Sequence, residues 1–309
     1  MSPRLNICMI GGSGFVSGTL VRIARDAGHN VWIVTRGERQ LPREDVHAIK
    51  VDRNDRSRFA KLIENVDRRF DLVVDCIGYV EDDARQDIAV FRGRCHHFVF
   101  ISTDFVFDPL RRRFPARADH SCFETQRDYG RQKRQCELQF MTSDTSDMAW
   151  TIVRPCHVYG PGLSLGCLPM HSRDVDLIEK MQNGDPLRLV GGGHFLQQPI
   201  LAEDLARTIL SCCGNGRAAG KIYMTAGPDI IESHQYYRLI GDVMGIKLTI
   251  EEVPVASYAQ EHPEHVPFLC HRIYDLRPMQ DDGLVVPSTP IVEGIRQATL
   301  GLIARGGWR

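Results

Sequence analysis

One stretch near the N-terminus, residues 5–28, limits the possible folds of this chain more than any other. Its first part, Leu5 to Ile10, is short and apolar, which is typical of a buried parallel strand. A glycine-rich turn follows, and beyond Gly14 apolar residues recur on one face of a helix, at Val16, Leu20, Ile23 and Ala27. A strand, a glycine turn and a helix in this order bring backbone N–H groups and the positive end of a helix dipole together. The stretch therefore predicts an anion site at the end of the first strand.

The turn has an irregular glycine pattern. Gly11 and Gly14 have the spacing of a dinucleotide-binding turn, but Ser17 stands near the position of a third glycine and Gly18 comes one place late. Because glycines after a first strand are also common as ordinary turn residues, this motif alone leaves both interpretations open.

Composition and charge exclude several classes of protein. With 309 residues, of which 43% are hydrophobic, the chain is long enough for one large domain or for a domain with a lobe. The formal net charge of −1 gives no electrostatic reason to expect nucleic acid or an acidic membrane as a partner. No apolar run is long enough to span a bilayer, and no stretch has the pattern of a signal peptide. The ten cysteines are scattered without a Cys-x-x-Cys pair, which favours reduced thiols in a cytoplasmic protein over disulfides or a zinc site.

Apolar runs alternate with helical patterns through the first half of the chain. Further strands are expected at residues 31–35, 46–51, 71–77, 97–103 and 149–155, with helices at 55–66, 81–91 and 129–140. This alternation predicts an α/β fold, a Rossmann-type doubly wound parallel sheet with helices on both faces. Ligands of such sheets bind at the carboxyl ends of the strands. That edge would carry Gly11 to Gly14, Arg36, Asp52, Cys76 to Gly78 and Ser102 to Asp104.

The second half of the chain adds a smaller lobe. Helices are expected at residues 174–181, 202–213, 232–244 and 290–304, and extended segments at 187–190 and 247–253, while residues 221–225 are expected to form a last strand of the sheet. We expect a dinucleotide-binding domain made of residues 1–155 and about 199–226. Residues from about 156 to 198 and from 227 to 309 would form a C-terminal substrate-binding lobe.

The end of the second strand bears on the choice of cofactor. Folds that prefer NAD place an acid there to bind the ribose 2′-hydroxyl, whereas an arginine accommodates the 2′-phosphate of NADP. Here Thr35 and Arg36 occupy the position, and the first acid is Glu38. The sequence therefore favours NADP, with NAD as the alternative, although an ordinary surface arginine would fit the same pattern.

Two polar clusters carry weaker signals. The run Arg111 to Arg113 is typical of a solvated loop rather than of a nucleic-acid site. The segment Glu261 to His265 has metal-ligating side chains, but Pro263 at its centre disfavours a regular helical ligand pair. No metal is expected.

Tyr129 and Lys133 lie four residues apart in a predicted helix, so their side chains share one face, one turn apart. Such a pair is ordinary on a helix surface. Here, however, it follows a strand that ends in Thr103, at the edge where a dinucleotide would bind. This setting makes the pair a candidate for catalysis.

Five motifs follow one another in order along the chain. They are Gly11-Gly-Ser-Gly-Phe-Val16, Ile101-Ser-Thr-Asp-Phe-Val-Phe107, Tyr129-Gly-Arg-Gln-Lys133, Arg154-Pro-Cys-His-Val-Tyr-Gly-Pro-Gly162 and Ala202-Glu-Asp-Leu-Ala206. With these motifs the chain resembles the extended short-chain dehydrogenases/reductases, the NAD-dependent epimerase/dehydratase group. The segment Pro287 to Gly294 is similar to the closing helix of that family, so the resemblance extends over nearly the whole chain.

The resemblance implies a catalytic set of Thr103, Tyr129 and Lys133. A tyrosine with a pKa of about 10 is a poor base at pH 7, and a lysine ammonium and an oxidised nicotinamide would lower that pKa. Tyr129 would exchange a proton with a substrate oxygen held by Thr103, and Lys133 would also bind the nicotinamide ribose. The residues that the resemblance assigns to cofactor binding are Gly11, Ser13, Gly14, Phe15, Val16, Arg36, Asp52, Arg53, Cys76, Ile77, Gly78, Lys133 and Pro155.

Departures from the family pattern narrow the range of reactions that the chain is expected to catalyse. Relatives that dehydrate nucleotide sugars carry an Asp-Glu pair after the catalytic threonine, whereas here Asp104 is followed by Phe105, so dehydration is disfavoured. The resemblance places the substrate near Asp104, Phe105, His157, Gln198 and Arg272, and the planar fork of Arg272 suits a diphosphate.

Two classes of function remain open. The first is an NADP- or NAD-dependent oxidoreductase or epimerase that transfers a hydride at a secondary alcohol or ketone of a sugar, with a nucleotide sugar as the expected substrate. Return of the hydride to the other face gives epimerisation, and exchange of the cofactor gives net reduction. The alternative is a catalytically weak family member that binds RNA or regulates through a bound dinucleotide; the complete set of Thr103, Tyr129 and Lys133 counts against it. The resemblance also implies a homodimer through the helix that carries Tyr129.

Overall fold

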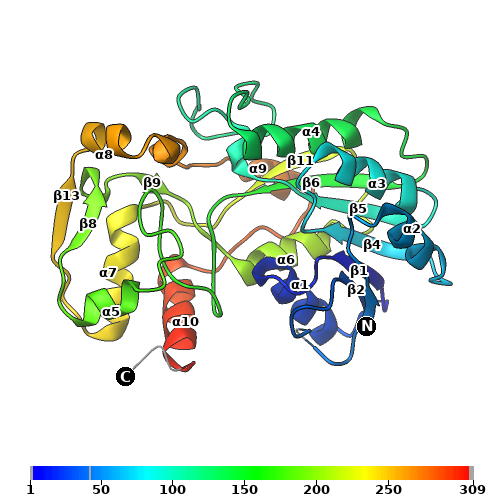
Figure 1. The fold of residues 1–309 in the computed structure, drawn as a ribbon, viewed down its shortest axis with the longest axis horizontal. Coiled ribbons are helices and arrows are strands. Elements are labelled where there is room, and N and C mark those ends of the chain that lie inside the picture. Colours follow the sequence, from blue (N-terminus) through cyan, green and yellow to red (C-terminus); the bar gives the residue numbers. More distant parts are fainter. Residues whose placement is uncertain (1–2, 42, 306–309) are drawn as a thin grey trace.

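The computed structural model describes residues 3–41 and 43–305, and Figure 1 shows their arrangement. Residues 1, 2, 42 and 306–309 lie outside the described residues. The expected division of the chain assigns the first three of these to the dinucleotide-binding domain and the last four to the C-terminal lobe. Within those residues no helix is both long enough and apolar enough to cross a bilayer. All ten cysteines are free thiols, and eight of them are buried.

Seven strands form one parallel sheet, which confirms the predicted fold class. The strands are β1 Asn6–Ile10, β2 Asn30–Thr35, β3 His47–Lys50, β4 Phe70–Asp75, β5 Cys95–Ile101, β6 Ala149–Pro155 and β11 Lys221–Thr225. Their order in the sheet is β11-β6-β5-β4-β1-β2-β3. Starting from β1, the chain adds β2 and β3 on one side and then crosses over to add β4, β5, β6 and β11 on the other side. In register, Ile10 at the end of β1 lies between Val34 and Asp75. A crevice at the carboxyl ends on this switch point is the usual ligand position in such sheets.

Helices cover both faces of the sheet (Figure 1). The helices are α1 Phe15–Asp26 and α6 Ala202–Ser211 on one face, and α2 Arg56–Glu64, α3 Glu81–Phe91 and α4 Asp128–Thr142 on the other. Alternate residues of β1 supply the two cores: Ile7 packs in the core under α1 and α6, whereas Cys8 packs in the core under α2, α3 and α4. Because both faces are covered, the inner strands β1, β2, β4 and β5 are largely apolar and buried rather than alternating, whereas the edge strand β3 is mostly exposed.

Most of the remaining elements pack at the other end of the molecule, whereas α9 (Arg277–Asp281) lies beside the sheet (Figure 1). Helices α5 Leu177–Gln182, α7 Ser233–Met244 and α10 Ile291–Ile303 share a third apolar core, which includes Tyr236 and Ile295. Strand β8 Leu187–Val190 pairs in parallel with β13 Ile250–Val253. Two further short pairs are formed by β7 Val158–Tyr159 with β10 Ile200–Leu201, and by β9 Leu196–Gln197 with β12 Ile231–Glu232.

The proline-containing segment between β13 and α10 contains elements that were not predicted from the sequence. It forms three short helices, α8 Val255–Glu261, η3 Pro263–Phe268 and α9 Arg277–Asp281. Pro263 and Pro278 stand in the first turns of η3 and α9, and Pro254 caps α8. Proline is suited to these places because its fixed φ matches a helix and its missing N–H would have no partner there.

Candidate active site

The glycine turn after β1 is shaped by close packing as well as by its backbone angles. Gly11 has a φ of +90°, and a Cβ there would lie 2.5 Å from Cγ2 of Ile77. A Cβ on Gly12 would lie 2.5 Å from Cγ2 of Ile33. Gly14 caps the N-terminus of α1, whose first turn contains no acidic residue. The turn therefore leaves the N–H end of α1 open to an anion such as a pyrophosphate, which fits the predicted cofactor.

Ser17 explains the irregular third position of the motif. Its hydroxyl accepts a hydrogen bond from the N–H of Gly14 at 2.9 Å and donates one to the carbonyl of Gly11 at 2.6 Å. The side chain is buried. Ser17 thus ties the two ends of the turn together, which a glycine at this position could not do.

Replacing Ser17 with alanine is expected to lower the free energy of unfolding by about 1–2 kcal/mol, because two buried hydrogen bonds of the turn are lost. Equilibrium urea unfolding measures the change. Ser57→Ala is the control, since Ser57 is exposed at the start of α2. Equal stabilities of the Ser17 and Ser57 variants would show that the serine contributes nothing to the turn.

A pocket of about 580 Å³ opens beside this turn, at the carboxyl ends of β1, β2 and β4. Ten of the residues assigned to the cofactor line it: Gly11, Ser13, Gly14, Phe15, Val16, Arg36, Asp52, Arg53, Cys76 and Ile77. The other three lie elsewhere: Gly78 and Lys133 bond to each other, and Pro155 ends β6. The position and size of the pocket fit part of a dinucleotide.

Arg53 forms a wall of the pocket rather than a free cation. Its buried guanidinium lies 3.0 Å from Asp75 and 3.1 Å from Asp87. Burial alone would raise the pKa of Asp75, but Arg53 holds it below its ordinary value. Burial and the neighbouring Asp75 raise the pKa of Asp87 well above the usual carboxyl range. The charge of Arg53 is therefore balanced by buried carboxyl groups of the protein, chiefly by Asp75.

Lys133 is buried at the edge of the sheet. Its Nζ donates hydrogen bonds to the carbonyls of Gly78 and Ile101, both at 2.7 Å. It also lies 5.1 Å from the centre of the Tyr79 ring, and Tyr79 lines the cofactor pocket. Burial lowers the pKa of the ammonium, and Asp75 opposes that shift. The lysine is thus held between the turn after β4 and the end of β5.

Tyr129 is placed one helical turn before Lys133 by the start of α4. Gly130 permits this position, because a Cβ there would lie 2.1 Å from the carbonyl oxygen of Phe105. The Tyr129 side chain is half exposed. Burial of part of it raises the pKa of Tyr129 above its ordinary value, and a hydrogen bond with Thr103 acts against the rise. The shift is opposite in sign to the one expected from Lys133, and a raised pKa favours the neutral phenol.

Asp104 is the centre of a buried ionic cluster that the sequence did not indicate. Its Oδ2 accepts hydrogen bonds from Arg112 at 2.9 Å, from the hydroxyl of Tyr274 at 2.6 Å, and from Arg272. Burial favours the neutral acid, but Arg272 and Arg112 hold the pKa of Asp104 below its usual value. Two of the five predicted substrate residues, Asp104 and Arg272, therefore bond to each other.

Arg112 corrects the interpretation of the three-arginine run. Arg111 and Arg113 are exposed as expected of a solvated loop, but Arg112 is buried on Asp104. A run of like charges gives no sign that its middle member turns inward, because the partner acid lies eight residues earlier on a different segment.

The other predicted substrate residues have different surroundings. Gln198 donates to the carbonyl of Gly227 and accepts from the N–H of Tyr274, both at 2.8 Å, so both ends of its amide have protein partners. Burial lowers the pKa of His157 to about 4, so its imidazole is neutral at pH 7. Phe105 lines a second, mostly apolar pocket of about 470 Å³, together with Tyr129 and Phe268.

Two residues that line the pocket beside the glycine turn, Tyr79 and Arg173, were not predicted from the sequence as site residues. Tyr79 directly follows the predicted edge residue Gly78, so its position could have been noted. Arg173 comes from a loop of the second lobe, where its φ of +56° is unusual for a residue with a side chain. It lines the pocket together with the glycine turn, although the two segments lie far apart in the sequence.

Two solved structures share this fold over almost their whole length. The UDP-glucose 4-epimerase of Thermotoga maritima, solved with UDP-glucose, is 17% identical with a TM-score of 0.76, and the match covers 97% of this chain and 99% of that one. The UDP-N-acetylglucosamine 4-epimerase of Methanobrevibacter ruminantium M1, solved with UDP-N-acetylmuramic acid, is 16% identical with a TM-score of 0.79, covering 98% and 99%.

One sequence relative has a different description. The chloroplast stem-loop binding protein of 41 kDa b from Arabidopsis thaliana is 24% identical over an aligned length of 240, and the match covers 73% of this chain. The match spans 60% of the length of that relative.

The family is shown by a match to the sequence itself. The model of the NAD dependent epimerase/dehydratase family matches residues 7–225, which run from β1 through β11 and include the glycine turn, Thr103, Tyr129 and Lys133. That range is more than half of the chain and contains the whole parallel sheet except Asn6. The chain therefore belongs to the NAD-dependent epimerase/dehydratase family.

Proposed function

We propose that this protein is an NAD(P)-dependent oxidoreductase or epimerase that acts on a secondary alcohol or ketone of a nucleotide sugar. One observation carries the proposal. Thr103 and Tyr129 meet at the sheet edge with Lys133 one helical turn away, and Lys133 contacts the ring of Tyr79, which lines the glycine-turn pocket. A proton-transferring pair and a dinucleotide site thus share one edge of the sheet.

The residues have separable roles in this proposal. A bound nicotinamide supplies the acceptor or donor of a hydride. The hydroxyl oxygen of Thr103 already accepts the N–H of Phe105 at 3.3 Å, and its proton, which faces Tyr129 here, can turn to hold a substrate oxygen. Neutral Tyr129 can give its proton to a carbonyl that becomes an alcohol, or take one back in the reverse direction. Lys133 stabilises the phenolate that is left when the proton has gone.

NADP is the form that we propose for the cofactor. No acid stands at the end of β2, and both Arg36 and Arg39 line the pocket. Arg36 pairs with Glu38 at 2.8 Å, with both side chains 62% exposed. An ion pair so open to water is worth little, so Arg36 can turn to a phosphate without a large loss.

Fluorescence titrations with NADPH and NADH test this proposal. The unchanged protein is expected to bind NADPH more tightly, and Arg36→Glu is expected to weaken NADPH binding by about tenfold or more, because a bidentate phosphate contact becomes a repulsion. NADH affinity should change little in the same variant. Tighter binding of NADH by the unchanged protein would overturn the NADP assignment, and binding of neither would overturn the enzyme proposal.

The substrate proposal is supported by two kinds of observation. Two structures with the same fold were solved with uridine-diphosphate sugars. In this chain Phe105 replaces a second carboxylate next to Asp104, and Asp104 itself is bonded to two arginines, so no free carboxylate base follows Thr103. This disfavours dehydration. A panel of uridine- and thymidine-diphosphate sugars decides the reaction: consumption of NAD(P)H shows a reductase, and interconversion of two sugars without net consumption shows an epimerase.

A second candidate function is RNA binding without turnover. Its support is the name of the Arabidopsis relative. The net charge of −1 gives no general attraction to phosphates.

We further propose a cytoplasmic homodimer through α3 and α4, where Leu138 and Met141 of α4 are exposed apolar side chains.

A further inference from the structure

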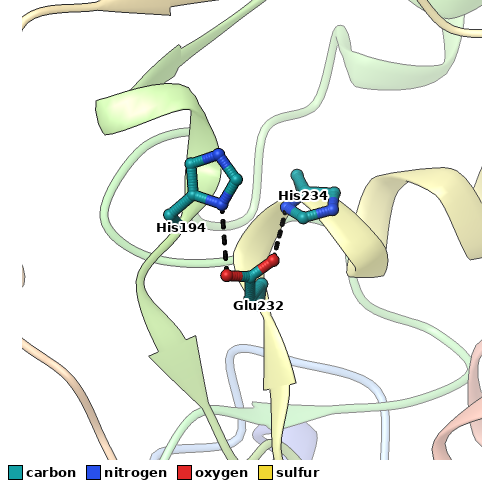
Figure 2. A group of neighbouring side chains, drawn as sticks. All are labelled: His194, Glu232 and His234. Atoms are coloured by element: carbon teal, nitrogen blue, oxygen red, sulfur yellow. Dashed lines mark hydrogen bonds and ion pairs between the residues drawn. The ribbon is translucent and has the colours of Figure 1, made fainter.

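A carboxylate lies between two imidazoles at the end of the molecule away from the parallel sheet. Figure 2 shows Glu232 with one carboxylate oxygen toward Nδ1 of His194 and the other toward Nδ1 of His234. The two distances are 3.1 Å and 3.3 Å. One ligand atom from each residue can be chosen so that all lie within 4.8 Å of one another. None of these residues takes part in the proposed active site.

The backbone holds the three side chains together. Gly191, Gly192 and Gly193 have φ values of +54°, +62° and +78°, and this left-handed turn directly precedes His194. A Cβ on Gly193 would lie 2.8 Å from Cβ of His234, so the turn packs directly on the start of α7. Strands β9 and β12 then pair next to it, with Leu196 opposite Glu232. The cluster is therefore fixed by backbone pairing and not by chance contact of long side chains.

One of the nitrogens has no hydrogen-bond partner. His234 is only 9% exposed, and its Nδ1 is buried without a hydrogen bond among the described residues, although it lies 3.3 Å from Glu232. A buried polar atom without a partner is unfavourable, so most such atoms in proteins bind something. His194, in contrast, keeps 69% of its side chain exposed, which leaves an open approach to the cluster.

We propose that His194, Glu232 and His234 bind a divalent transition-metal ion of the zinc type. Two imidazole nitrogens and one carboxylate are a usual three-ligand set for Zn²⁺, with the fourth position open to water. Bonds of about 2.0–2.1 Å in a tetrahedron place ligand atoms about 3.3 Å apart. Each imidazole nitrogen lies near that separation from its own carboxylate oxygen, at 3.1 Å for His194 and 3.3 Å for His234. The metal would give the buried Nδ1 of His234 the partner that it lacks. It would also join the 191–197 segment to the start of α7.

A second group of similar residues, His262, Glu264 and His265, serves as an internal comparison. There Nδ1 of His265 is hydrogen-bonded to the hydroxyl of Tyr258 at 2.7 Å, and the two imidazoles stack with an interplanar angle of 20°. Stacked rings present their faces to each other, so their nitrogens converge poorly on one ion. This group is therefore the weaker candidate.

Zn²⁺ titration against a chromogenic chelator tests the proposal on the full chain. We expect one equivalent to bind, and we expect His194→Ala and Glu232→Gln each to weaken binding by about tenfold or more, because each removes a direct ligand. The double variant His262→Ala/His265→Ala is the matched control and should keep the affinity of the unchanged protein. Mg²⁺ should not compete, because it prefers oxygen ligands.

Three outcomes would overturn the proposal: no binding by the unchanged protein, binding that survives both His194→Ala and Glu232→Gln, or loss of binding only in the His262/His265 variant. Circular dichroism and thermal melting without metal report whether each variant is folded. His194 is exposed, so its alanine variant remains a valid test even if Glu232→Gln, which alters the start of α7, is destabilised.

Discussion

Replacing Tyr129 with phenylalanine is expected to reduce turnover by at least about 100-fold, because the variant can neither give nor take the proton of the substrate oxygen. Affinity for the dinucleotide should change little, since the residues that line the glycine-turn pocket are untouched. The aromatic ring and its contact with Phe105, at 6.1 Å between ring centres, are kept in the variant. Steady-state rates with the nucleotide sugar that the unchanged protein converts, together with cofactor titrations, measure the two effects separately.

The control for this experiment is Tyr258→Phe, which removes a tyrosine hydroxyl from α8 at the other end of the molecule. Its turnover should equal that of the unchanged protein. If Tyr129→Phe turns over at the full rate, Tyr129 has no part in the mechanism and the proposed proton transfer fails. If cofactor affinity falls together with the rate, the side chain acts in binding and the assignment changes.

Replacing Asp104 with asparagine is expected to lower the free energy of unfolding by about 3–5 kcal/mol at pH 7, because two buried guanidinium groups lose their counter-charge. Both arginines, Arg112 and Arg272, have side chains that are 1% exposed, so water cannot replace the carboxylate. Equilibrium unfolding in urea measures the loss. Asp119→Asn is the control, since the exposed pair that Asp119 forms with Arg117 is worth little.

The pH dependence of the Asp104 effect has a definite sign. The pKa of Asp104 is lower in the folded protein than in an ordinary carboxyl group, because Arg272 and Arg112 outweigh the effect of burial. Its charge therefore stabilises the fold fully above the unfolded-state value of about 3.9, and this contribution is lost as the pH falls through the folded-state value. The stability difference between the unchanged protein and Asp104→Asn should be constant near neutral pH and shrink in acid. A difference that grows in acid, or an unchanged stability at pH 7, would contradict the ionic role of Asp104.

The elements that the sequence predicted well are those with strong local patterns. Each of the seven sheet strands lies within a residue or two of its predicted range. For the inner strands the reason is that a buried parallel strand is a continuous apolar run. The amphipathic α7 begins and ends within a residue of its expected range, at Ser233 and Met244. The short helices between Pro254 and Asp281 were not predicted, since helices of five to seven residues have too few turns to show a periodic pattern.

The candidate site divides in a similar way. The glycine turn, Thr103, Tyr129 and Lys133 stand next to strand ends or one helical turn apart, so sequence spacing alone brings them to one edge. No spacing rule of this kind predicts the hydrogen-bond partners of Asp104 and Gln198. Arg272 is 168 residues from Asp104, and Tyr274 is 76 residues from Gln198.

The sequence by itself therefore determined the parallel sheet, the edge at which we propose that the cofactor binds and the order of the proposed catalytic side chains, because all of these depend on local apolar periodicity and on short spacings. Only the tertiary structure decided which charged and polar groups remain free to meet a ligand. Packing of the two ends of the molecule encloses Arg112 and Arg272 with Asp104, and it brings Arg173 to the cofactor pocket. A buried charge must find its counter-charge wherever the fold provides one, and that partner depends on contacts between distant segments that no local pattern encodes.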